Sequence, residues 1–161
     1  MARIIGVIGS NTAVGEIYAL AEEVGRRIAK AGAHLICGGL GGVMEAACKG
    51  AAEAGGLTIA ILPGDDPRSA NRYVAVPIAT GLGIARNVII VRASDVLIAI
   101  SGGYGTLNEI AAALKLEKPV VGLETWDLTA AGDVDPNLFF PVQTPEQAVQ
   151  KALELARKHG Q

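Results

Sequence analysis

The residues best suited to chemistry lie in the stretch SGGYGTLNE (101–109), where three glycines follow an apolar run and precede a carboxylate. Glycine lets the backbone turn sharply and approach a ligand without an intervening side chain. The helix expected to start here adds unpaired N–H groups and the positive end of its dipole, which favour an anion, most often phosphate. The stretch predicts a phosphate-binding loop made of Ser101, Gly102, Gly103, Tyr104, Gly105 and Thr106.

Two charged side chains could add chemistry to such a loop. Glu109 lies one helical turn after Gly105, so it can point towards the same ligand and stabilise positive charge or move a proton. It can equally be a solvated carboxylate near a helix N-terminus. Arg86 is a lone cation in the apolar segment GLGIARNVIIV (81–91), where it either extends to water or pairs with a carboxylate or a ligand.

Two other junctions between an expected strand and an expected helix are also rich in glycine or polar residues. Ligands of open α/β sheets bind beyond the carboxyl ends of the strands, so three such junctions favour a ligand site there. A single glycine turn would be explained equally well by tight packing. The spacing excludes both the G-x-G-x-x-G dinucleotide fingerprint and the P-loop. The candidate binding residues at these two junctions are Gly9, Ser10, Gly38, Gly39 and Gly42.

Short apolar runs alternate with segments of helical periodicity along the whole chain. The expected strands cover 3–9, 33–37, 57–63, 74–79, 95–100 and 119–123, and the expected helices cover 14–32, 42–56, 83–94, 105–117 and 144–160. The composition of the segment 83–94 also suits a strand. We expect a helix there, because the apolar run that follows, 95–100, is the better strand. This alternation predicts a single α/β Rossmann-like domain over residues 1–161, with a parallel sheet and helices on both faces.

Composition narrows the possible partners. The net charge of −2 comes with no basic stripe, which argues against nucleic acid. No apolar run reaches the eighteen residues of a membrane span, and no signal peptide is evident, so we expect a cytoplasmic protein. Half of the residues are hydrophobic, which predicts a buried sheet and a homodimer or higher homo-oligomer. The isolated Cys37, Cys48, His34 and His159 lack metal-ligand spacing, so we expect no metal.

Three runs, 8–39, 42–64 and 85–110, resemble the LONELY GUY (LOG) superfamily, which includes proteins long labelled lysine decarboxylases. The resemblance covers roughly residues 4–123. Its most specific part is the GGxGTxxE motif, which is met by Gly102, Gly103, Gly105, Thr106 and Glu109.

The enzymes of this superfamily are cytokinin riboside monophosphate phosphoribohydrolases, and the resemblance implies a role for each motif residue. The glycine loop would hold the 5′-phosphate, while Glu109 and Arg86 would be catalytic and assist cleavage of the N-glycosidic bond. Two departures stand out: Ser101 replaces the proline that normally opens the motif, and Arg86 lies in GIARN rather than in a Met-His-Glu-Arg-Lys context.

The segment 80–123 is more similar to a shorter branch that resembles molybdenum cofactor carrier proteins, which bind a pterin bearing a phosphate. In that branch Asn71, Thr80 and Gly81 would also line the ligand region, although plain turn chemistry explains them equally well. We therefore expect a protein that binds an AMP-like nucleotide or molybdenum cofactor and requires no further cofactor. It would act as a phosphoribohydrolase or, alternatively, as a non-catalytic carrier or a nucleotide-sensing protein.

Overall fold

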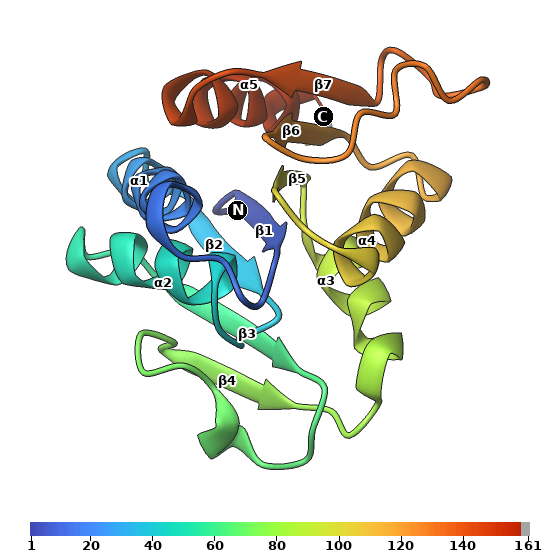
Figure 1. Ribbon diagram of the computed structural model, residues 1–161. Helices are drawn as coiled ribbons and strands as arrows, with labels where there is room; N and C mark the ends of the chain where they lie inside the picture. The colour runs from blue at the N-terminus through green and yellow to red at the C-terminus, as the bar shows by residue number, and fades with distance from the viewer. Residues whose placement is uncertain (159–161) are drawn as a thin grey trace.

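Residues 1–158, which the computed structural model describes, form a seven-stranded sheet between two layers of helices (Figure 1). All neighbouring strands are parallel, in the order β4-β3-β2-β1-β5-β6-β7. The strands are β1 (Ile4–Gly9), β2 (His34–Cys37), β3 (Thr58–Leu62), β4 (Val76–Ala79), β5 (Val96–Ile100), β6 (Val120–Leu123) and β7 (Phe139–Val142). The fold is the predicted α/β, Rossmann-like one.

The helices divide between the two faces of the sheet. They are α1 (Gly15–Lys30), α2 (Val43–Glu53), α3 (Asn87–Ala93), α4 (Tyr104–Lys115) and α5 (Pro145–Lys158), with 3-10 turns η1 (Pro67–Ser69) and η2 (Gly83–Arg86). The α1, α2 and α5 helices pack on one face, and α3 and α4 pack on the other (Figure 1). The interior strand β5, next to the central β1, is buried along its whole length, because both of its faces are covered.

The observed elements follow the predicted ones closely, apart from shifts of a few residues at several ends, one divided helix and one additional strand. The expected helix over 83–94 is divided into η2 and α3, and helix α4 begins at Tyr104 rather than at Gly105. The end of the last expected helix, including His159, lies outside the described residues. Strand β7 was not predicted, because its sequence FFPV contains Pro141 and follows a long polar loop. Proline is tolerated there because β7 is an edge strand, whose outer side needs no N–H donor.

The order of the strands determines where a ligand can bind. The chain builds the sheet outward from β1 to β4 and then returns to add β5 on the other side of β1. Gly9 at the end of β1 is in register with Ile100 at the end of β5, so the turns that follow these two strands start side by side. This reversal creates the crevice in which open α/β sheets bind ligands. None of the helices within residues 1–158 has the length and apolarity to cross a bilayer.

Candidate functional site

A cavity of about 320 Å³ lies at this reversal, between the turn after β1, the η2–α3 segment and the start of α4. Seven of the predicted site residues line it: Gly9, Ser10, Arg86, Gly103, Gly105, Thr106 and Glu109. The fold thus brings residues from three distant parts of the sequence to one place.

The start of α4 forms the amide-rich wall of the cavity. Gly103 is the N-cap residue and provides no side-chain cap, and the first helical hydrogen bond runs from the Leu107 N–H to the Gly103 carbonyl. The N–H groups of the three residues in between therefore have no partner within the helix. A Cβ atom added at Gly103 or Gly105 would meet nothing within 4 Å, so the space beside both residues is open. This geometry suits an anion.

The Glu109 side chain is buried beside these amides, with 8% of its surface exposed. Its carboxyl group forms no hydrogen bond or ion pair with any residue in 1–158. Burial raises the pKa of Glu109 to about 7, and the charge of the nearby Arg86 only partly opposes this shift. At neutral pH the group is therefore divided between its acid and its carboxylate, and it can give or accept a proton.

Arg86 is held rigidly on the opposite wall. Its Nε donates to the Ile61 carbonyl at 2.9 Å, and its Nη1 donates to the Asn87 side-chain oxygen. Burial lowers the pKa of Arg86, whereas Glu109 raises it, and an arginine remains protonated at neutral pH. Nη2 lies against Gly38 and donates to no acceptor among the described residues. A buried cation with free donors, facing unpaired amides, attracts an anionic ligand.

The glycines of the turn after β2 lie in close contact with neighbouring turns, strands and side chains. Gly38, Gly39 and Gly42 do not line the cavity. A Cβ at Gly42, whose φ is +58°, would lie 2.1 Å from the Ser10 carbonyl oxygen, so this glycine permits close contact between two turns. At Gly38 a Cβ would lie 2.7 Å from the Arg86 guanidinium, so this position gives the arginine room.

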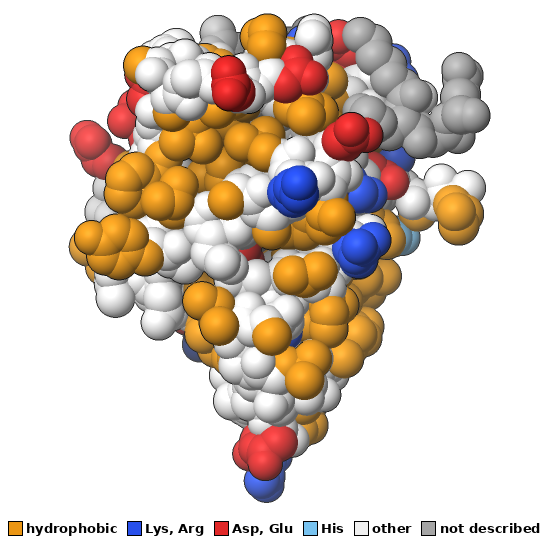
Figure 2. All heavy atoms as spheres, turned by 90° about the vertical axis from the view of Figure 1, so that its right-hand side faces the viewer, with side chains coloured by type: hydrophobic (Ala, Val, Ile, Leu, Met, Phe, Trp, Pro, Cys, Tyr) orange, Lys and Arg blue, Asp and Glu red, His pale blue; other side chains and the backbone are white. Residues whose placement is uncertain are grey.

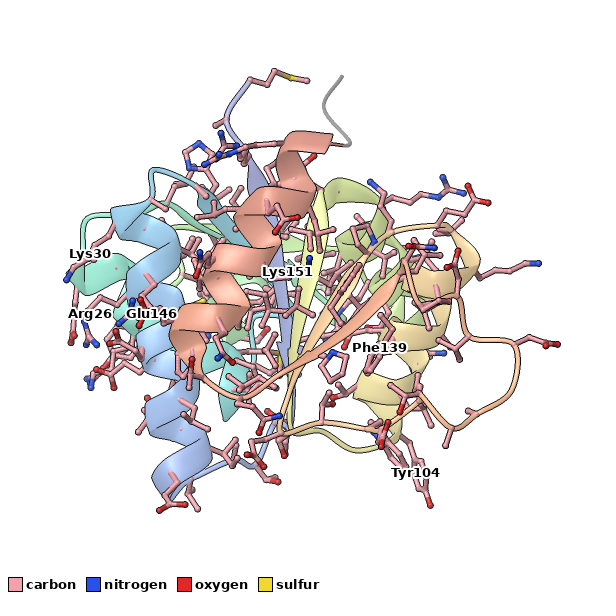
Figure 3. The ribbon with its side chains drawn as sticks, turned by 90° about the horizontal axis from the view of Figure 1, so that it is seen from above. Arg26, Lys30, Tyr104, Phe139, Glu146 and Lys151 are labelled. Carbon is pink, nitrogen blue, oxygen red and sulfur yellow. The ribbon has the colours of Figure 1, made fainter. Side chains whose placement is uncertain are left out.

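The other predicted residues lie around the cavity without lining it. Asn71 donates to the Leu40 carbonyl at 3.0 Å, and Thr80 donates to the Leu62 carbonyl at 2.6 Å, so both stabilise turns. Gly81 has a φ of +65° in the turn before η2. At the end of β5 the backbone of Ser101 and Gly102 turns through positive φ, and Tyr104 points away from the sheet (Figure 3).

Sequence reasoning missed five residues that also line the cavity: Asn11, Leu40, Met44, Ile84 and Asn87. Asn87 had a signal, because it is a polar residue next to Arg86 in an apolar segment, and it is 2% exposed. The others are ordinary apolar or turn residues, and only the fold shows that they meet.

Fold and cavity together define a Rossmann-like domain with a crevice at its topological switch point, lined by the start of a helix, a buried arginine and a buried carboxyl group. The chain belongs to the SLOG cluster4 family, whose model matches residues 2–157. The expected membership of the LOG-like superfamily is thereby confirmed.

The relatives of this chain span nearly its full length. An uncharacterized protein from Archaeoglobus fulgidus is 46% identical over 154 residues, which cover 96% of this chain and 97% of the relative. The molybdenum cofactor binding protein of the phototrophic bacterium Rippkaea orientalis is 39% identical, with a TM-score of 0.89 over 96% of this chain and 98% of that one. The molybdenum cofactor carrier protein of Chlamydomonas reinhardtii is 38% identical, with a TM-score of 0.87 over 98% and 99% of the two chains.

Proposed function

We propose that this protein binds molybdenum cofactor and carries it without chemical change. The observation that carries the proposal is the cavity, in which free helix amides, a buried arginine and an unpartnered carboxyl group converge. The similarity to proteins described as binding or carrying molybdenum cofactor supports the same ligand.

In this proposal the phosphate of the cofactor lies against the N–H groups of Gly105 and Thr106, and Arg86 Nη2 neutralises its charge. The carboxyl group of Glu109 then faces the organic part of the ligand, where its acid and carboxylate forms match either an acceptor or a donor.

The test uses molybdenum cofactor released from a purified molybdoenzyme. We expect the cofactor to co-elute with the protein in gel filtration, as measured from its pterin fluorescence after oxidation, and to decay more slowly than the free cofactor. Gly105→Asp, which places a negative charge in the open space of the loop, should abolish the binding. Gly64→Asp, also in open space but outside the cavity, should not. The proposal is wrong if no pterin co-elutes with the wild-type protein.

A second candidate, phosphoribohydrolase activity, is favoured by the pKa of Glu109, which is suited to a general base at neutral pH. Water would attack C1′ of a nucleoside 5′-monophosphate, and Glu109 would take a proton from it. The bond from C1′ to the base would break, its electron pair would leave with the base, and the base nitrogen would take the proton from Glu109, which restores the carboxylate. Wild-type protein should then release adenine from AMP, and Glu109→Gln and Arg86→Ala should not. Binding of AMP without adenine release over hours excludes this activity.

A homo-oligomer is the third part of the proposal. Six apolar side chains are exposed on the edge strand β4 and on the adjoining η2–α3 segment: Val76, Ile78, Leu82, Ile84, Val88 and Ile89. Figure 2 faces the side of the molecule that carries α3 and α4, and hydrophobic side chains gather on it. Light scattering at micromolar concentration should give a multiple of 16.4 kDa, and Val88→Glu should reduce it. A monomer mass for the wild-type protein would contradict this part.

A further inference from the structure

An exposed pair of aromatic rings stands directly beside the cavity. Tyr104 and Trp126 are stacked, with ring centroids 6.4 Å apart and planes inclined by 25°. Tyr104 is 85% exposed and Trp126 is 36% exposed. Figure 3 shows Tyr104 extending outward from the start of α4. The chain has only six aromatic residues, so an exposed pair at this place calls for an explanation.

The pair is held in position by the turns on which it stands. Trp126 Nε1 donates to the Gly103 carbonyl at 3.2 Å, and the Thr125 hydroxyl donates to the Ser101 carbonyl at 2.6 Å. Ser101 and Glu124 both have positive φ, at 53° and 52°, which a non-glycine residue adopts at a cost in free energy. The end of β6 is thus tied to the glycine loop in a strained arrangement that fixes the tryptophan.

Trp126 also lines a second cavity, of about 260 Å³, at the carboxyl ends of β6 and β7. Its polar lining is rich in hydrogen-bond acceptors: Glu124, Thr125, Asp127, Thr129 and Gln143. Gly103, whose carbonyl accepts the tryptophan's hydrogen bond, lines the first cavity. The aromatic pair therefore stands where the two cavities adjoin.

We propose that the Tyr104–Trp126 pair is a stacking platform for the heterocyclic ring of the ligand whose phosphate lies at the start of α4. The inference rests on the proposed function and adds to it the residues that recognise the ring. Tyr104 directly precedes Gly105, whose N–H would hold the phosphate, so one ligand can extend from the phosphate site to the tyrosine ring. The N–H groups of a pterin or a purine would find acceptors in the second cavity.

The test compares the wild-type protein with Tyr104→Ala and Tyr104→Phe, using molybdenum cofactor, AMP and ribose 5-phosphate as separate probes. Because base stacking on an aromatic side chain is worth roughly 1–3 kcal/mol, Tyr104→Ala should weaken the binding of the ring-bearing probe about tenfold. Tyr104→Phe should retain the wild-type affinity, and the affinity for ribose 5-phosphate, which has no heterocycle, should be the same in all three proteins. The cofactor and AMP arms show whether the ring is a pterin or a purine.

Each other outcome overturns the inference. If the wild-type protein binds the cofactor or AMP and Tyr104→Ala binds it equally well, the stacking platform is wrong and the proposed function stands. If Tyr104→Ala keeps its affinities but no longer passes the cofactor to an apo-molybdoenzyme, the pair is a docking surface for a protein. If the wild-type protein binds neither ring-bearing probe, both proposals fail. Thermal unfolding of each variant controls for correct folding. Because the Tyr104 side chain is exposed, the midpoint of the unfolding transition should be the same in the variants as in the wild-type protein.

Trp126 provides an independent check. Trp126→Phe removes the hydrogen bond to Gly103 but keeps an aromatic ring, so it should weaken the binding of the ring-bearing probe less than Trp126→Ala does. Equal affinity in the wild-type protein and in Trp126→Ala would contradict a role for this ring.

Discussion

Two glycine-rich turns of this protein look alike in sequence and differ in what surrounds them. In the turn CGGLGG (37–42) after β2, atoms of neighbouring turns and strands stand where a Cβ of Gly38, Gly39 or Gly42 would be. In the turn SGGYG (101–105) after β5, the positions beside Gly103 and Gly105 are open. Glycine serves close packing in the first turn, whereas Gly103 and Gly105 leave open space beside the cavity in the second. The number of glycines does not distinguish these roles, whereas the neighbouring atoms do.

The helices that follow explain the difference. Most of α2 is buried, so its start must lie close to the turn after β1, and the Val43 N–H donates to the Ser10 carbonyl at 2.9 Å. Within residues 1–158 the first N–H groups of α4 have no such partner, and Gly103, Gly105 and Thr106 line the cavity. The comparison therefore predicts that an added methyl group lowers the free energy of unfolding at Gly42 and does not lower it at Gly105.

The largest effect is expected for Gly42→Ala. The new Cβ would meet the Ser10 carbonyl in a backbone conformation with positive φ, so strain and steric overlap should lower the free energy of unfolding by roughly 3 kcal/mol or more. Chemical denaturation measures this. Gly55→Ala is the matched control, because Gly55 also has positive φ but an added Cβ meets nothing within 4 Å, and it should cost about 1 kcal/mol. Equal losses in the two variants would contradict the packing role of Gly42.

The next effect concerns the buried carboxyl group behind the second turn. The pKa of Glu109 is about 7 in the folded protein and near 4.5 when exposed, so the folded state binds this proton more tightly than the unfolded state does. The stability that the group contributes is complete below pH 4.5 and is lost as the pH rises to about 7. Glu109→Gln should therefore gain stability relative to the wild type over this range, by up to about 3 kcal/mol. Denaturation at pH 4.5 and pH 8 tests it, and a constant difference would contradict the raised pKa.

Gly105→Ala should separate stability from binding. A methyl group in open space at the start of a helix should leave stability unchanged or raise it by up to about 1 kcal/mol. The same methyl group stands where the phosphate would approach, so the affinity for molybdenum cofactor should fall about tenfold or more. Gly64→Ala, an open position away from the cavity, should change neither quantity. Unchanged affinity in Gly105→Ala would mean that the ligand does not use this loop.

The smallest effect is expected for Asn71→Ala, beside the first turn. Asn71 donates to the Leu40 carbonyl and accepts from the Tyr73 N–H, so the substitution should lower the free energy of unfolding by about 1 kcal/mol. Because the side chain does not line the cavity, cofactor affinity should stay within about twofold. A larger loss of affinity would mean that Asn71 contacts the ligand, as the sequence predicts.

The sequence predicts most of the fold, because buried parallel strands and amphipathic helices have strong hydrophobic patterns. It also predicts the meeting of Arg86 and Glu109, through the LOG-like motif. It does not predict β7, in which an edge position overrides the usual exclusion of proline. The role of Trp126 cannot be predicted either, since a single aromatic residue in a loop has no periodicity, and its partner Gly103 is 23 residues away.

Trp126 is the only tryptophan of the chain, and its indole is anchored to the loop proposed to hold the phosphate. All of the indole emission of this protein therefore originates at the rim of the candidate site. Binding and release of the proposed ligand should be readable in real time from unlabelled protein, without a dye, a tag or a coupled assay.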